Sequence, residues 1–375
     1  MPDTDAAANL LARLVAAVRH RRRAPASALA GIALLALRLD RQPLAAALTR
    51  VALGGGPVAD DRTAWLLCRL AEYCLSAAPD DRALVAAARR KAVAVLHEQY
   101  RFDLAADHVD LINGAGGVGM RLWDVADDAL RRAVAPSLAE AANQIARQPT
   151  NGLYHGRSGA LLLRRMLHTV PTADTASAAP AVADTAGGTT PGPTAARRDT
   201  GDAVVVDDLA RLTPAALDTG ELGIGGVTLC YGLPGMAVAL GPDVDPRLAA
   251  AVEGTPVAAA SLTRLAALVA DPDSDETLCH GLAGVGLAMR LAPLWRRIVP
   301  DDLRTRLTDR LVAHLDRADD EQVYATFDVP SVHAMLSGPL GVALALAETA
   351  NPTPPWWGAG LSLGDGTPTV AGGGR

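Results

Sequence analysis

Two similar octets carry the residues best suited to chemistry. The first, TLCYGLPG, spans Thr228–Gly235, and the second, TLCHGLAG, spans Thr277–Gly284. Cys230, Cys279 and His280 stand at the heads of their two turns, and thiolate and imidazole are ligands that zinc favours. Three protein ligands leave a coordination position open for a substrate, as in catalytic zinc sites. The octets therefore predict an open zinc site.

A site of this composition suits one kind of chemistry. Two thiolates and a neutral imidazole on Zn²⁺ sum to a formal charge of zero. A further thiol that binds there loses its proton near neutral pH, yet it stays electron-rich and nucleophilic. The predicted site is therefore suited to activating a substrate thiol. The alternative is a pair of buried cysteines and a hydrogen-bonded histidine in a helical core.

The octets belong to a longer series of small-residue turns that run into apolar helices. The second small residue of each turn marks the unit: Gly31, Gly117, Gly159, Gly235, Gly284 and Gly341. The interval between the first two markers, Gly31 and Gly117, is the longest in the series. It leaves room for a degenerate unit near residues 54–56, followed by a helix over residues 65–75. The pattern thus predicts an all-α repeat of seven units. Each unit contributes two helices and buries its apolar face against its neighbours.

The bulk composition excludes several classes of protein. The chain of 375 residues is 50% hydrophobic and 20% charged, which suits a soluble globular protein with a large core. Its net charge of −6 argues against nucleic-acid binding. We expect a cytoplasmic protein, since the sequence shows neither an export signal nor an apolar run long enough to span a membrane. Cys68 and Cys74 are predicted to be buried core residues.

We expect one domain over residues 1–358, with a flexible insert at about 171–203 and a Gly-rich tail at 359–375. The insert is rich in Ala, Thr, Pro, Gly and Asp and has almost no large apolar side chain, so it cannot bury enough surface to order itself.

Two charged runs have simple interpretations. Arg19–Arg23 is interpreted as the solvated end of a helix over residues 9–18; contact with an acidic peptide or with lipid is the alternative. Asp271–Glu276 is interpreted as a turn ahead of Cys279, because it lacks the glycine and the distal glutamate of a calcium loop.

Two further residues are candidates for the chemistry. His155 stands at the head of another repeat turn and could act as an acid or base; an isolated core histidine is the alternative. Asp110, four residues before Gly114, could orient an imidazole or a substrate amide; a plain helix cap is the alternative. His108 and His333 lack support from the repeat and are treated as background.

Three motifs resemble those of a known family. They are CYGLPG from Cys230, CHGLAG from Cys279 and HGRSG from His155. Together they are similar to the lanthionine synthetase C-like proteins, the cyclases of lantibiotic biosynthesis, and the resemblance covers about residues 26–357. It implies a double-layered α/α toroid of about seven helix pairs with GxxG repeats. It also implies zinc bound by Cys230, Cys279 and His280.

The resemblance implies a reaction as well. A dehydrated precursor peptide offers dehydroalanine or dehydrobutyrine, and a cysteine thiolate of the same peptide, activated by zinc, adds to the β-carbon to form a thioether ring. Protonation of the resulting enolate completes the step. His155 corresponds to the family's active-site histidine, Asp110 to its active-site aspartate, and Tyr231 lines the site. A separate dehydratase and a transporter are the implied partner proteins.

The sequence departs from the family pattern close to the first zinc cysteine. Gly226 stands where members often carry arginine, and Leu229 stands where tryptophan is usual. Two alternative functions therefore stay open. One is the addition of a small thiol such as glutathione to dehydrated peptides, and the other is a non-catalytic scaffold that binds the precursor peptide.

Overall fold

The computed structural model describes residues 2–21, 24–56, 58, 60–148, 153, 156–167, 227–241, 246–328, 335–336 and 338–347. Within these ranges the regular elements are helices, apart from an isolated bridge between Val227 and Gly232. The prediction of an all-α protein is therefore confirmed. None of the described helices is both long enough and apolar enough to cross a membrane.

Mostly buried helices largely alternate along the chain with helices that bury only one face. The elements are α1 (Pro2–His20), α2 (Ala26–Arg38), α3 (Gln42–Gly54), α4 (Asp61–Leu75), η1 (Pro79–Asp81), α5 (Arg82–Ala105), α6 (Ala115–Val125), α7 (Asp128–Ala146), α8 (Arg157–Leu167), α11 (Leu233–Leu240), α12 (Pro246–Glu253), α13 (Pro256–Ala270), α14 (Leu282–Leu291), α15 (Pro293–Ile298), α16 (Asp301–Arg317), α17 (Asp320–Ala325) and α19 (Pro339–Ala347).

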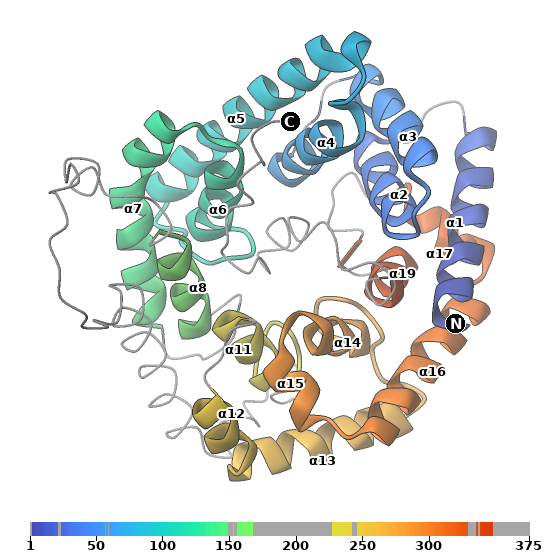
Figure 1. Ribbon diagram of the computed structural model, residues 1–375, viewed down its shortest axis with the longest axis vertical. Coiled ribbons are helices and arrows are strands. Elements are labelled where there is room, and N and C mark those ends of the chain that lie inside the picture. Colours follow the sequence, from blue (N-terminus) through green and yellow to red (C-terminus); the bar gives the residue numbers. More distant parts are fainter. Residues whose placement is uncertain are drawn as a thin grey trace, which may run out of the picture.

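The apolar helices lie toward the centre of the molecule (Figure 1). Every residue of α11 and α19 is buried, as are all but one residue of α2 and of α6. A helix that is apolar on all sides is stable only when it is covered all round. These inner helices contact one another in chain order, from α2 through α4, α6, α8, α11 and α14 to α19, and α19 contacts α2. The described inner helices therefore form a closed circuit.

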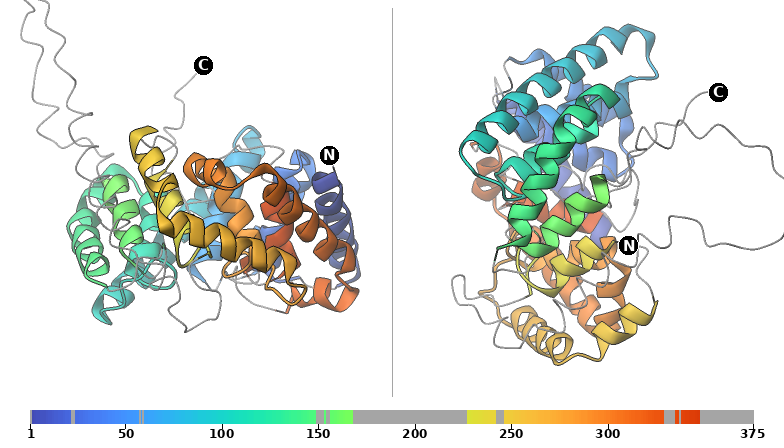
Figure 2. Two further views of the ribbon diagram at one scale, coloured as in Figure 1. Left: turned by 90° about the horizontal axis from the view of Figure 1, so that it is seen from below. Right: turned by 90° about the vertical axis from the view of Figure 1, so that its left-hand side faces the viewer.

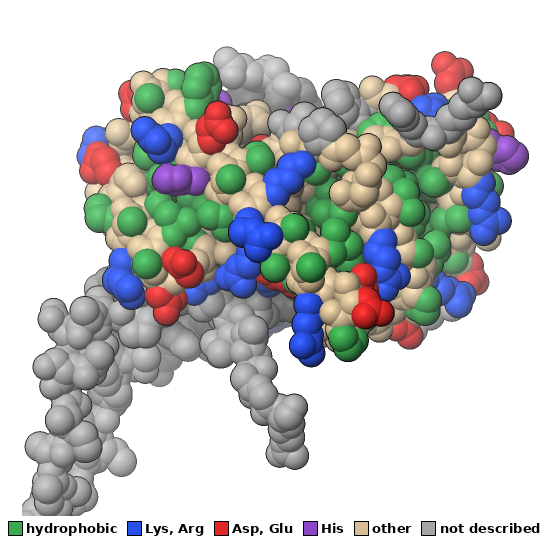
Figure 3. Space-filling view, turned by 90° about the horizontal axis from the view of Figure 1, so that it is seen from above, with side chains coloured by type: hydrophobic (Ala, Val, Ile, Leu, Met, Phe, Trp, Pro, Cys, Tyr) green, Lys and Arg blue, Asp and Glu red, His purple; other side chains and the backbone are tan. Residues whose placement is uncertain are grey.

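The longer helices cover the outside of this circuit and bury one stripe each. In α16 the stripe is Leu303, Leu307, Leu311 and Leu315, at a spacing of four residues. The other faces carry charge, so these helices separate the core from solvent. Seen from the side, the described helices make a body broader than it is thick (Figure 2). On the face in Figure 3, basic and acidic side chains are interspersed.

The marker glycines allow the inner helices to pack closely. A Cβ atom added at Gly235 would collide with the carbonyl oxygen of Leu229 and lie 2.9 Å from the Cβ of Leu153 in the preceding unit. Gly284 is held in the same way by the carbonyl of Leu278, and its added Cβ would lie 3.2 Å from the Cβ of Leu229. Only glycine can fill these positions without moving a backbone.

Helix α1 covers the junction of α19 and α2 from outside the circuit. It packs against α16, α17 and α19. Arg13 Nη1 donates to the carbonyl of Ala318 at 2.7 Å, and the Arg21 guanidinium lies 4.9 Å from the ring centroid of Phe327. Arg21 also forms an ion pair with Asp328 at 3.0 Å. Arg21, in the predicted basic cluster, thus contacts the protein itself, whereas Arg22 and Arg23 lie outside the described residues.

Other predictions have mixed outcomes. Cys68 is buried as predicted, but Cys74 is only partly buried, because its side of α4 packs at the edge of the core. The run Asp271–Glu276 is the predicted turn, in which Asp271 accepts a hydrogen bond from the Asp273 amide at 3.0 Å. The predicted insert and Gly-rich tail lie outside the described residues.

The close packing at Gly284 predicts a large effect of a single methyl group. We expect Gly284→Ala to lower the free energy of unfolding by about 1–3 kcal/mol, because the added Cβ overpacks the Leu278 backbone and the Leu229 side chain. The matched control is Gly286→Ala in the same helix, where the nearest side-chain atom, on Leu311, would lie 3.5 Å from the new Cβ. The control should be neutral or stabilise the protein by up to about 1 kcal/mol. Urea denaturation measures the free energy of unfolding of both variants. An equal change in the two would contradict the packing argument.

Candidate metal centre

The two cysteines occupy equivalent positions in two turns. Cys230 lies three residues before α11, and Cys279 lies three residues before α14. A glycine caps each helix, Gly232 with φ of 106° and Gly281 with φ of −107°. The positive φ at Gly232 is a conformation that L-residues with a side chain rarely adopt. The first turn therefore requires glycine directly after Tyr231.

Backbone hydrogen bonds fix both turns. In the first, the Thr228 amide donates to the Tyr231 carbonyl at 3.0 Å, and the Tyr231 amide donates to the Thr228 hydroxyl at 3.0 Å. In the second, the carbonyl of Leu336 accepts from the amides of Leu278 at 3.0 Å and Cys279 at 3.1 Å. The second turn is thus tied to the segment that precedes α19.

The turns bring three ligand atoms together. The Sγ atoms of Cys230 and Cys279 lie 3.1 Å apart, and Cys279 Sγ lies 3.7 Å from His280 Nε2. All three ligand atoms are within 4.8 Å of one another. Both cysteines are buried, whereas His280 is partly exposed. These three residues could hold a metal ion, and no other such cluster occurs in the part of the chain that the structure describes.

The surroundings of the cluster disfavour a thiolate unless positive charge lies nearby. The hydrogen bond with Cys279, together with burial, raises the pKa of the Cys230 thiol far above its usual range. The hydrogen bond to Cys279 also raises the pKa of His280; burial opposes this shift, and the nearby Asp275 adds to it. Two adjacent sulfurs in a buried site cannot both be thiolates unless positive charge lies beside them. A bound metal cation would provide that charge.

Tyr231 lies next to the cluster. Its ring stacks on the imidazole of His280, with centroids 6.3 Å apart and planes inclined by 15°. The ring is partly buried, so it covers one side of the histidine while His280 keeps some exposure. Tyr231 therefore lies beside the ligand His280, and its catalytic role stays a prediction.

Asp110 caps the turn before α6. Its Oδ1 accepts hydrogen bonds from the amides of Ile112, Asn113 and Gly114, at 2.8, 2.7 and 3.1 Å. Its Oδ2 lies 3.3 Å from Nε2 of His108. Asp110 thus shapes the turn ahead of α6, whereas the N-cap of the helix itself is Gly114, without a side-chain cap. The carboxylate also orients an imidazole, that of His108, which the sequence analysis set aside because it lacks support from the repeat.

His155, the predicted acid or base, lies outside the described residues, as do Gly226 and His333. The neighbouring residues Leu153 and Gly156 are both buried just before α8. The sequence matches no protein-family model and no curated protein.

The cluster predicts stoichiometric metal binding. We expect about one zinc ion per chain in protein equilibrated with zinc, and close to none in Cys230→Ala or Cys279→Ala, because the loss of one thiolate from a three-residue site removes most of its affinity. Cys74→Ala, at a distant and partly buried cysteine, should keep the metal. Elemental analysis after gel filtration measures the content, and circular dichroism checks the helices. Equal zinc in all four proteins would exclude this cluster as the site.

Proposed function

We propose that this protein is a zinc-dependent cyclase that forms lanthionine and methyllanthionine thioether rings in a dehydrated precursor peptide. The observation that carries the proposal is the convergence of Cys230, Cys279 and His280 from two equivalent repeat turns. Neither cysteine forms a disulfide, so both sulfurs are available as ligands. The likeness of the surrounding motifs to lanthionine synthetase C-like proteins supplies the reaction.

The dimensions of the cluster suit zinc. Tetrahedral Zn²⁺ with bonds of about 2.3 Å to sulfur and 2.0 Å to nitrogen separates two sulfurs by roughly 3.8 Å and a sulfur from a nitrogen by roughly 3.6 Å. The corresponding separations here are 3.1 and 3.7 Å. A small outward rotation of one thiol reaches the first value. Both cysteines also lie just before helix amino termini, where the helix dipole favours thiolates.

The chain's own residues have distinct tasks in this proposal. When bound, zinc would lower the pKa of the peptide's cysteine thiol and so supply the nucleophile near neutral pH. Tyr231 stacks on His280 and holds the imidazole in place. His155 is the proposed acid or base that moves the proton to the enolate carbon. One oxygen of Asp110 accepts the amide hydrogen bonds that fix the turn before α6. The other oxygen lies beside the imidazole of His108.

We further propose that the closed circuit of inner helices and the outer helices form a double-layered α/α toroid of seven pairs. Seven inner helices are described, α2, α4, α6, α8, α11, α14 and α19, and each of the six marker glycines lies in one of them. A cytoplasmic location and partnership with a separate dehydratase and a transporter belong to the same proposal.

Ring closure itself is the direct test. The substrate is a synthetic peptide with one cysteine and one dehydroalanine. N-ethylmaleimide then labels every cysteine that is still free, and mass spectrometry counts the labels. Ring closure consumes the free cysteine, so the number of labels falls. We expect the protein with zinc to make this fall at least a hundredfold faster than it is in the spontaneous reaction. Cys279→Ala should abolish the acceleration, and Cys74→Ala should keep it. Zinc-loaded protein that does not accelerate ring closure would favour the scaffold alternative. If glutathione is added and the protein joins it to the dehydroalanine, the small-thiol alternative would be favoured.

A pair of substitutions separates the two roles of Asp110. Asp110→Ala removes the acceptor of three amide hydrogen bonds and should destabilise the protein by about 1–2 kcal/mol. Asp110→Asn keeps an oxygen acceptor and should fold normally, but it loses the charge that orients an imidazole. We expect its rate of cyclisation to fall by about a hundredfold at unchanged stability. A full rate in Asp110→Asn would show that the residue acts only as a cap.

A further inference from the structure

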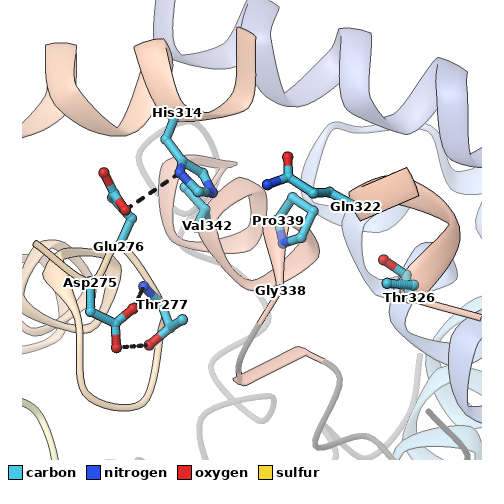
Figure 4. Close-up of a pocket in the computed structure, with 10 residues that line it drawn as sticks. Asp275, Glu276, Thr277, His314, Gln322, Thr326, Gly338, Pro339 and Val342 are labelled. Atoms are coloured by element: carbon cyan, nitrogen blue, oxygen red, sulfur yellow. Dashed lines mark hydrogen bonds and ion pairs between the residues drawn. The ribbon is translucent and has the colours of Figure 1, made fainter. Parts of the chain in front are cut away.

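A groove lies on the far side of the turn that carries Cys279 and His280. It has a volume of about 240 Å³ and runs between that turn and the helices α16, α17 and α19. Figure 4 shows Asp275 and Thr277 at one end and Gln322 and Thr326 at the other, with Pro339 between them. Its volume is below that of drug-sized pockets and suits a group of about one amino-acid residue.

The first end of the groove carries negative charge. Glu276 is paired with Arg310 at 2.7 Å, so its charge is compensated. Asp275 accepts hydrogen bonds from the amide and hydroxyl of Thr277, at 2.7 and 2.9 Å, and forms no ion pair among the described residues. Burial lowers the pKa of His314, which lies beside Glu276, so this imidazole is neutral at pH 7 and adds no positive charge. This end therefore attracts a cation.

The second end offers neutral polar groups. Thr326 is only 4% exposed, and its hydroxyl has no hydrogen-bond partner within the described residues. Such a buried hydroxyl costs free energy unless a ligand or water satisfies it. The side-chain oxygen of Gln322 accepts from the amide of Asp319 at 3.1 Å, which leaves its amide nitrogen as a donor. In Figure 4 this nitrogen points toward His314, into the groove.

The middle of the groove is apolar. Pro339, Val342 and Ala325 contribute its lining there. A ligand that fills the groove therefore needs a cationic head, an apolar stem and a carbonyl or hydroxyl group at the opposite end.

We propose that this groove binds a lysyl residue, with its ammonium group at Asp275, its methylene stem over Pro339 and Val342, and its backbone carbonyl at Gln322 and Thr326. An ammonium group has three donors and no acceptor, which matches the acceptors at the first end. The stem gains free energy by covering apolar surface. None of the three metal ligands lines the groove, so this proposal does not depend on the proposed catalytic function.

Three probes test the proposal by isothermal titration calorimetry on the full chain: Nα-acetyl-lysine N-methylamide, its norleucine counterpart without the ammonium group, and n-butylammonium without the carbonyl. We expect the lysine probe to bind with a Kd of roughly 1 mM. The other two should bind at least about tenfold more weakly, because each loses a polar contact. Equal binding of the norleucine probe would overturn the cationic end, and equal binding of n-butylammonium would show a site for free alkylamines instead.

Substitutions assign the two ends of the groove. Asp275→Asn keeps an acceptor for the Thr277 amide, and its amide nitrogen can donate to the Thr277 hydroxyl, but the negative charge is lost. It should weaken the lysine probe about tenfold or more. Its matched control is Asp273→Asn, on the same exposed turn but outside the groove, which should bind normally. Thr326→Val should also weaken binding, while it leaves thermal stability unchanged or raised. If Thr326→Val raised stability and left the affinity unchanged, the hydroxyl would be merely unpaired and the proposed carbonyl contact would be wrong.

Discussion

The rest of the structure depends on the close passage of four of the marker glycines beneath a carbonyl group six residues earlier in the chain. The pairs are Gly159 with Leu153, Gly235 with Leu229, Gly284 with Leu278 and Gly341 with Met335. The same apolar side chains contact the glycine of the next unit, so one contact both shapes a turn and joins two units. Cys230 follows Leu229 directly, and Cys279 follows Leu278. The packing of the circuit therefore also sets where the two sulfurs lie.

The sequence was most informative where a feature repeats. The helical class, the buried glycine-bearing helices and the meeting of Cys230 with Cys279 follow from the similarity of the two octets, since equivalent positions in adjacent units lie side by side. Features without a repeat could not be predicted. The pairing of Asp110 with His108 depends on the local turn, and the contact of Glu276 with Arg310 and His314 joins residues more than thirty positions apart. The partial burial of Cys74 depends on where the core ends.

Charge balance links the predicted metal site to its surroundings. The sulfurs of Cys230 and Cys279 are held 3.1 Å apart in a buried position, which is unfavourable for two anions and favourable for one cation between them. Burial strengthens both the repulsion between anions and their attraction to a cation, because the core has a lower dielectric constant than water and screens charges less. The same turn presents Asp275 and Glu276 on its other side. A single turn of chain therefore borders both the metal ligands and the groove between α16, α17 and α19.

The packing of α1 against α16, α17 and α19 has a consequence for the order of folding. The hydrogen bond from Arg13 to Ala318 joins positions 305 residues apart, so it forms only after nearly the whole chain is available. Contacts between consecutive helices are local and can form as the chain is synthesised, whereas this contact bears the entropy of closing a very long loop. Until then, the faces of α16 and α19 that α1 covers remain open to water and to other chains. The packing of α1 is thus the step that removes these faces from contact with other chains.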